Sequence, residues 1–145
     1  MKENAQYWTF DLVQERLVEA MELWRRSPGG GKWPFASDGP WHLIRKEWSD
    51  WDARDPKPLR SLPLTRDEVR RRDEASGWFA IINERDRPLV VLAITYLARG
   101  YGQVPWKRML APLGLKFGSD GLRMRYGRAI RALAMDLERR KVAVS

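Results

Sequence analysis

The chain has 145 residues, of which 43% are hydrophobic, and this is the size of one globular domain. It contains no cysteine and a single histidine, His42, so it lacks both a cysteine nucleophile and the usual ligands of a zinc site. No apolar run is long enough to span a bilayer, and no secretory signal is readable. We therefore expect a cytoplasmic protein with no membrane partner, no metal and no cofactor.

Positive charge is concentrated in the second part of the chain. The whole sequence has 27 Lys and Arg against 19 Asp and Glu, which gives a net charge of +8. Residues 1–84 hold 14 basic and 15 acidic side chains, whereas residues 85–145 hold 13 basic and 4 acidic ones, so the net charges are −1 and +9. A concentrated positive field favours a polyanion such as nucleic acid. The alternative is a generally basic, solvated surface.

The first predicted helix spans residues 10–26, with Thr9 as its candidate N-cap. The apolar residues that follow at helical spacing are Leu12, Val13, Leu17, Ala20, Met21 and Trp24. Glycine and proline in residues 27–34 predict a loop. A short helix with an aromatic face is predicted over residues 40–52, and a proline-rich extended connector over residues 55–64.

A second long helix is predicted over residues 66–83. Thr65 and Glu68 have the spacing of a capping box at its start. The apolar face of this helix comprises Val69, Ala75, Trp78, Phe79 and Ile82. The basic run Arg70–Arg72 is interpreted as the solvated side of the helix, because flanking acidic residues nearly cancel its charge.

A buried helix is predicted directly after this block. Asp86 is its expected N-cap, Pro88 lies in its first turn, and Gly100 ends it. The residues between are apolar on nearly every side, which is typical of a central helix.

The last two predicted helices have the order of a helix-turn-helix motif. A short helix over residues 104–112 is followed by a turn that opens at Gly114. Ser119 is then expected to cap a long helix that runs to about Arg140. In this motif the second helix enters the major groove of DNA by its N-terminal end. The predicted fold is therefore all-α, a helical bundle with a C-terminal helix-turn-helix.

The long last helix has two distinct faces at about 100° per residue. The stripe that is expected to pack on the preceding helices comprises Leu122, Tyr126, Ala129, Ile130, Leu133 and Leu137. The opposite side is expected to face DNA. It comprises Asp120, Met124, Gly127, Arg128 and Arg131, with Arg123 and Arg125 on its flanks.

Arginine suits DNA recognition because its planar fork bonds two acceptors on a guanine edge or grips a phosphate. Gly127 is expected to let the helix backbone approach the duplex closely. Lys107, Arg108 and Lys116 are expected to contact phosphates and set the orientation. With Ser119 at the start of the helix, these residues complete the predicted DNA-binding site. Because no nucleophile–base pair, metal cluster or cofactor loop can be assembled, no catalytic residue and no enzymatic activity are predicted.

Three groups of residues suggest a relationship to known proteins. They are Trp8-Thr9-x-x-Leu12-Val13-x-x-Arg16-Leu17-x-Glu19-Ala20, then Asp73-Glu74-Ala75-x-x-Trp78, then Trp106-Lys107 followed by Leu113-Gly114 and an arginine-rich helix. With these motifs in this order, the chain resembles a family of phage and prophage helix-turn-helix proteins of unknown function. The resemblance implies a DNA-binding protein of a mobile element, without enzymatic activity. The turn at residues 116–119 is slightly longer than the family's tight form.

The leading interpretation is a sequence-specific double-stranded DNA-binding protein of phage type. It would be a transcriptional regulator that forms a homo-oligomer and associates with the nucleoid of a bacterial host cell. A small terminase-like subunit that recognises packaging sites is an alternative that the sequence does not separate from it. In a third interpretation the chain is an adaptor that docks on RNA polymerase, since seven of the eight tryptophans precede Phe79. Residues 1–62 are accordingly assigned to oligomerisation or partner docking, and residues 63–145 to DNA binding.

Overall fold

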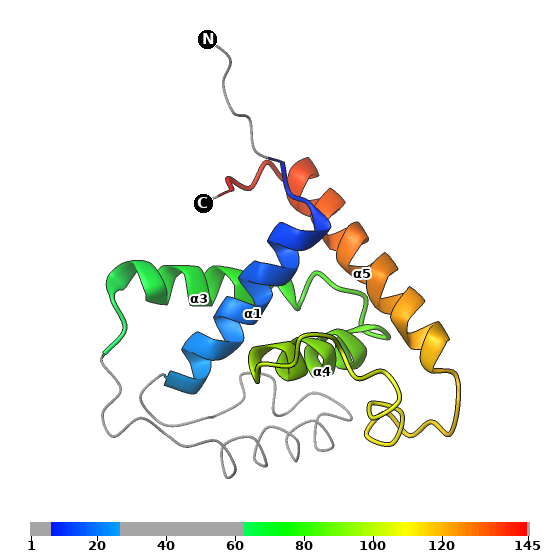
Figure 1. Ribbon diagram of the computed structural model, residues 1–145. Coiled ribbons are helices and arrows are strands. Elements are labelled where there is room, and N and C mark those ends of the chain that lie inside the picture. Colours follow the sequence, from blue (N-terminus) through cyan, green and yellow to red (C-terminus); the bar gives the residue numbers. More distant parts are fainter. Residues whose placement is uncertain (1–6, 27–62, 145) are drawn as a thin grey trace.

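The computed structural model describes residues 7–26 and 63–144. These residues form four helices and no strand, which confirms the predicted all-α class. The helices are α1 (Phe10–Arg26), α3 (Arg66–Trp78), α4 (Arg87–Ala98) and α5 (Ser119–Arg139) (Figure 1). The predicted loop over residues 27–34, the predicted helix over residues 40–52 and most of the predicted connector over residues 55–64 lie outside the described residues.

α1 has the bounds that the sequence predicts. It follows Thr9, whose hydroxyl accepts the backbone N–H of Leu12 at 3.2 Å. Its buried stripe packs against α3, α4 and α5 in one core; the most buried members are Val13, Leu17, Ala20 and Met21. α1 therefore shares a core with helices of the region 63–145, although residues 1–62 and 63–145 are predicted as two regions.

Trp8 ties the start of α1 to the end of α5. Its indole N–H donates to the carbonyl of Val142 at 2.8 Å, and its backbone N–H donates to the carboxylate of Glu138. Its ring lies edge-on to the ring of Trp78, with a centroid separation of 5.0 Å. The bond to Val142 joins residues that are 134 positions apart in the sequence.

A buried arginine lies beside these two tryptophans. The guanidinium carbon of Arg16 is 5.9 Å from the ring centroid of Trp8 and 5.3 Å from that of Trp78. Arg16 is only 4% exposed, and its Nη2 pairs with the carboxylate of Glu74 at 2.9 Å. A buried charge requires such partners, because removing it from water is otherwise strongly unfavourable. The pair joins α1 to α3.

α3 begins with the predicted capping box but ends earlier than predicted. The hydroxyl of Thr65 accepts the N–H of Glu68 at 3.1 Å, and the carboxylate of Glu68 accepts the N–H of Thr65 at 2.9 Å. The helix ends at Trp78 rather than near residue 83. The guanidinium of Arg87 donates hydrogen bonds to three carbonyls that follow the end of α3, those of Phe79, Ala80 and Ile82. These bonds come from the first residue of α4 and hold the carbonyls outside a continuing helix. Apolar spacing alone does not show them, so it predicts too long a helix for α3.

The capping box gives a testable stability effect. Thr65→Ala removes the hydroxyl that accepts the Glu68 N–H, and we expect the free energy of unfolding to fall by about 0.5–2 kcal/mol. Urea unfolding followed by far-UV circular dichroism measures this change. Thr65→Ser keeps the hydroxyl and is the matched control. A serine variant as unstable as the alanine variant would contradict the capping role.

α4 is buried on nearly every side, as predicted. Residues 89–96 are all buried, and the hydroxyl of Thr95 is satisfied by donating to the carbonyl of Val91 at 2.8 Å. Proline occupies the first turn, where a missing N–H is tolerated. Asp86 is the N-cap residue, as predicted, but its side chain makes no capping hydrogen bond.

The α-helix predicted over residues 104–112 is not formed. Residues 106–114 make consecutive turns instead. The N–H of Met109 is shared, at 3.2 Å each, between the carbonyls three and four residues before it. Pro112 has no N–H to donate, and a proline disfavours the helical conformation in the residue that precedes it. The segment therefore forms single turns with helical hydrogen bonds and not a continuous α-helix.

α5 runs from Ser119 to Arg139, close to its predicted end. Its N-cap is Gly118 rather than Ser119, with a φ of 101° in the left-handed region that glycine adopts without strain. Ser119 is the first helical residue, so the predicted serine cap is wrong. All six residues of the predicted apolar stripe are buried. The packing face of α5 is therefore confirmed.

Candidate nucleic-acid interface

Cations without ion-pair partners gather on the exposed side of α5. Arg123, Arg128 and Arg131 are all exposed. Within the part of the chain that the structure describes, none of the three forms an ion pair with an acidic side chain. They lie within the first 13 of the 21 residues of the helix, on the side that the sequence predicts to face DNA.

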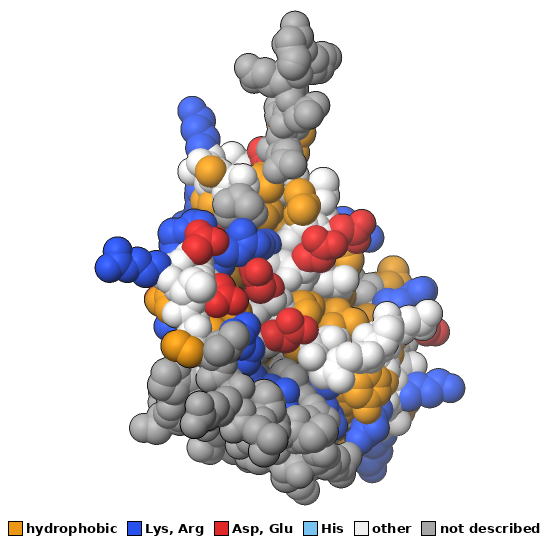
Figure 2. Space-filling model, turned by 60° about the vertical axis from the view of Figure 1, so that its left-hand side comes forward, with side chains coloured by type: hydrophobic (Ala, Val, Ile, Leu, Met, Phe, Trp, Pro, Cys, Tyr) orange, Lys and Arg blue, Asp and Glu red, His pale blue; other side chains and the backbone are white. Residues whose placement is uncertain are grey.

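The arginines of α3 are arranged differently. Arg71 pairs with the carboxylate of Glu19 on α1 at 3.0 Å, and Arg72 lies over the ring of Trp24 at 4.1 Å from its centroid. Figure 2 shows acidic side chains next to basic ones on this side of the molecule. The charge of the run Arg70–Arg72 is therefore cancelled locally, as predicted. Arg71 and Arg72 are nevertheless partly buried by their contacts with α1 rather than fully solvated.

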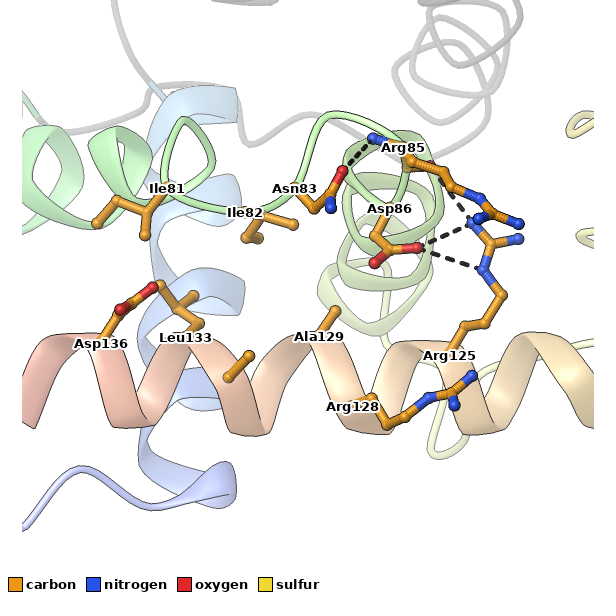
Figure 3. A pocket seen from close by; sticks show the side chains of 11 residues that line it. Ile81, Ile82, Asn83, Arg85, Asp86, Arg125, Arg128, Ala129, Leu133 and Asp136 are labelled. Atoms are coloured by element: carbon orange, nitrogen blue, oxygen red, sulfur yellow. Dashed lines mark hydrogen bonds and ion pairs between the residues drawn. The ribbon is translucent and has the colours of Figure 1, made fainter.

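Arg125 is a structural residue, contrary to its predicted place in the DNA-binding site. Its guanidinium donates to the carboxylate of Asp86 at 3.0 and 3.3 Å and to the carbonyl of Arg85 at 3.3 Å (Figure 3). These bonds hold α5 against the start of α4. They also explain why the Asp86 side chain makes no capping hydrogen bond to α4, since its carboxylate is bound by Arg125 instead.

A hollow of about 640 Å³ lies between α5 and the turn that joins α3 to α4. We name it the turn-side hollow. Its lining includes apolar side chains such as Ile82 and Leu133, as seen in Figure 3. It also includes two acidic side chains, Asp86 and Asp136, together with Arg128 at its edge. The turn-side hollow therefore carries charges of both signs.

A second hollow, of about 480 Å³, lies between α1, residues 102–106 and the other side of α5. We name it the α1-side hollow. The rings of Trp106 and Phe10 both pack on the ring of Tyr126, with centroid separations of 5.5 and 5.9 Å. The hydroxyl of Tyr126 donates to the side-chain carbonyl of Gln14 at 2.7 Å, and burial raises the pKa of Tyr126 well above its usual value. The Tyr126 hydroxyl therefore stays protonated, and the aromatic side of this hollow carries no charge.

Gly127 is buried, so the prediction that it brings the helix backbone close to DNA is wrong. A Cβ atom at this position would lie 3.2 Å from Nη1 of Arg131, which places the Arg131 side chain across the Gly127 backbone. The same guanidinium is 5.9 Å from the ring centroid of Phe10. The missing side chain at Gly127 thus lets Arg131 lie against α5 at the edge of the α1-side hollow.

The remaining predicted site residues surround the start of α5. Lys107, Lys116 and Asp120 are exposed, and Ser119 is half-buried. Arg108 is exposed, and its Nη1 donates to the hydroxyl of Tyr101 at 2.9 Å. Met124 is 62% exposed and lines the α1-side hollow together with Arg123, Arg128 and Arg131. With Gly127, the structure therefore brings five of the predicted residues to one hollow.

Eight residues that line this hollow are outside the predicted site, among them three with side chains from other parts of the fold. Phe10 and Gln14 come from α1, and Gln103 comes from the segment after α4. Gln14 and its partner Tyr126 are 112 positions apart, so no local pattern could place them together. Only the packing of α1 against α5 creates this side of the site.

Comparisons of the chain with protein families, with curated proteins and with solved structures give no match. None of the helices in the two described segments is long and apolar enough to cross a membrane. The same segments contain no group of three or more side chains suited to hold a metal ion. The resemblance to phage helix-turn-helix proteins therefore stays a prediction, and a proposal about function depends on the geometry around α5.

Proposed function

We propose that this chain binds double-stranded DNA with the N-terminal half of α5 in the major groove. The observation that carries the proposal is the contrast between the two sets of arginines. The run Arg70–Arg72 of α3 is engaged by acidic and aromatic side chains of the protein, whereas Arg123, Arg128 and Arg131 have no acidic partner among the described residues. Cations without an internal acidic partner attract an external anion, and a duplex presents phosphates at regular spacing.

The surroundings of α5 support its role as the element that enters the groove. The two hollows flank the helix, and Arg128 lines both of them. An α-helix with its side chains is about 10–12 Å wide, and the major groove is about 12 Å wide. A helix with a hollow on each side can enter the groove while the two phosphate backbones pass beside it.

The segment before α5 supplies the contacts that would set orientation. Lys107 and Lys116 are exposed on residues 106–118, directly before the helix. In our proposal this irregular segment takes the place of the first helix of a helix-turn-helix. Its lysines contact phosphates and carry no sequence information.

The biological role that we propose is sequence-specific regulation of phage type in a bacterial cytoplasm, by a homo-oligomer on DNA. Trp8 and Trp78, two of the tryptophans that suggest a docking surface for RNA polymerase, are core residues and are only 5% and 4% exposed. They give no support to the adaptor interpretation. A mass measurement in solution separates regulation from packaging, because a dimer suits a two-fold site and a ring suits a terminase-like subunit.

Two substitutions distinguish base reading from phosphate contact. Arg128→Ala should reduce the discrimination between a selected duplex and its scrambled version by about 1–3 kcal/mol, because a bidentate base contact is lost. Lys107→Ala should instead weaken binding to both duplexes and reduce the salt slope by about one. Fluorescence anisotropy with a duplex selected from a random library, and with its scrambled version, measures both effects.

Arg140→Ala is the matched control, because it removes an exposed arginine beyond the C-terminal end of α5. We expect it to leave discrimination unchanged. If Arg128→Ala lowers affinity equally on both duplexes, α5 is only a phosphate clamp, and the regulator role gives way to an architectural or packaging one. If the wild-type protein binds no duplex at low salt, the proposed function is wrong.

A further inference from the structure

The α1-side hollow differs in charge from two other hollows of the described surface. The turn-side hollow includes Asp86 and Asp136, and a third hollow of about 390 Å³ along α1 includes Glu15, Glu19 and Glu22. The ionisable groups that line the α1-side hollow are three arginines and one buried tyrosine, with no carboxylate among them. Of these three hollows, the α1-side hollow is therefore the one suited to an anion.

The lining also provides an apolar surface of the right kind for a flat ring. Trp106 is half-buried, and Met124 on α5 is 62% exposed although it is a large apolar side chain. Both line the hollow. Bases stack readily on aromatic side chains, and thioethers make favourable contacts with ring edges.

From these features we infer that the α1-side hollow binds one nucleotide unit, an unstacked base together with its phosphate. The base lies against Trp106 and Met124, and the phosphate is held by Arg123 and Arg131. The volume of about 480 Å³ falls within the range of small-molecule sites, which is about 300–1,000 Å³. Gln103 and Gln14 offer amide groups at the same hollow.

The position of the hollow connects this inference with the proposed function, on which it rests. Arg123, Arg128 and Arg131 belong to the face of α5 that we place in the major groove, so a nucleotide displaced from the duplex would have only a short distance to travel. Extruding a base requires breaking its stacking, and a pocket with aromatic and cationic walls offsets that loss. The nucleotide unit has two sources, an unpaired nucleotide within a strand or a free nucleotide.

The test compares two isosteric amide-to-carboxylate substitutions on opposite sides of α5. Gln103→Glu places a negative charge in the α1-side hollow, and Asn83→Asp places one in the turn-side hollow. Both residues are exposed, so both variants should fold, which circular dichroism checks. The probes are a fluorescein-labelled single-stranded oligothymidylate, deoxyadenosine 5′-monophosphate alone, and a blunt duplex.

We expect Gln103→Glu to weaken binding of the single-stranded probe by about tenfold, because its carboxylate repels the phosphate, and Asn83→Asp to leave it within about twofold. Binding of the free monophosphate would identify a free nucleotide as the source, and binding of the oligothymidylate alone would identify an unpaired nucleotide in a strand. In addition, an oligonucleotide that contains 5-bromodeoxyuridine should photocrosslink to residues 102–106 or to the start of α5.

Three results would overturn the inference: neither the oligothymidylate nor the monophosphate binds, both variants weaken binding equally, or the crosslink maps outside the α1-side hollow. Titration of the same protein preparations with the blunt duplex tests the proposed function separately. A protein that binds the duplex but neither of the other probes keeps the proposed function and loses this site.

Discussion

Duplex binding should weaken by about 100-fold when the salt concentration rises from about 50 to about 200 mM. Each phosphate that is neutralised lowers the slope of log K against log salt by about 0.9, and four contacts give a slope of about −3.6. The four cations that we assign to phosphates are Arg123, Arg131, Lys107 and Lys116, whereas Arg128 is assigned to a base edge. Fluorescence anisotropy with a labelled duplex at a series of salt concentrations measures the slope.

A charge-matched pair of triple variants tests where the slope originates. Replacing Arg123, Arg128 and Arg131 by glutamine should reduce the slope by about 1.8, since the phosphate contacts of Arg123 and Arg131 are lost. Replacing Arg139, Arg140 and Lys141 removes the same net charge at the other end of α5 and should leave most of the slope in place. Equal reductions in the two variants would mean that binding reflects overall charge rather than a site on the N-terminal half of α5.

The largest stability effect is expected at Trp78. Trp78→Ala should lower the free energy of unfolding by about 3–5 kcal/mol, because it leaves a large cavity in the core. The same substitution removes the edge-on partner of Trp8 and one of the two rings beside the buried Arg16 guanidinium. Urea unfolding of the two proteins measures the difference.

The control for this truncation is an aromatic side chain outside the core. Phe117 is 84% exposed, so Phe117→Ala should change stability by no more than about 0.5 kcal/mol. A loss at Trp78 smaller than about 1 kcal/mol would show that α1 and α3 do not depend on this contact. The description of one shared core would then be wrong.

Features that depend on neighbouring residues could be predicted from the sequence. The bounds of α1 follow from Thr9 and the apolar spacing, the capping box from Thr65 and Glu68, and the burial of α4 from its unbroken apolar run. The packing face of α5 follows from helical periodicity. Each of these predictions requires only positions within a few turns of one another.

Features that depend on distant residues could not be predicted in this way. Arg125 looks like a groove-facing arginine until Asp86, 39 positions earlier, is brought beside it. Gly127 looks exposed until the side chain of Arg131 covers it. In the irregular segment over residues 106–114, Pro112 is a local signal that disfavours a helix in the preceding turn, although it lies at the end of the predicted helix. The aromatic side of the candidate site requires the packing of α1 on α5, which no local pattern contains.

The bonds of Trp8 to Glu138 and Val142 have a consequence for synthesis on the ribosome. α1 leaves the exit tunnel first, but its partners on α3, α4 and α5 are translated later, so its apolar stripe has no native surface to cover it in the meantime. Contacts of such large sequence separation also slow folding, since a long loop must close before they form. A nascent chain stalled before residue 138 should therefore remain open to proteases and bind chaperones through α1, and protection should appear only when the end of α5 has emerged.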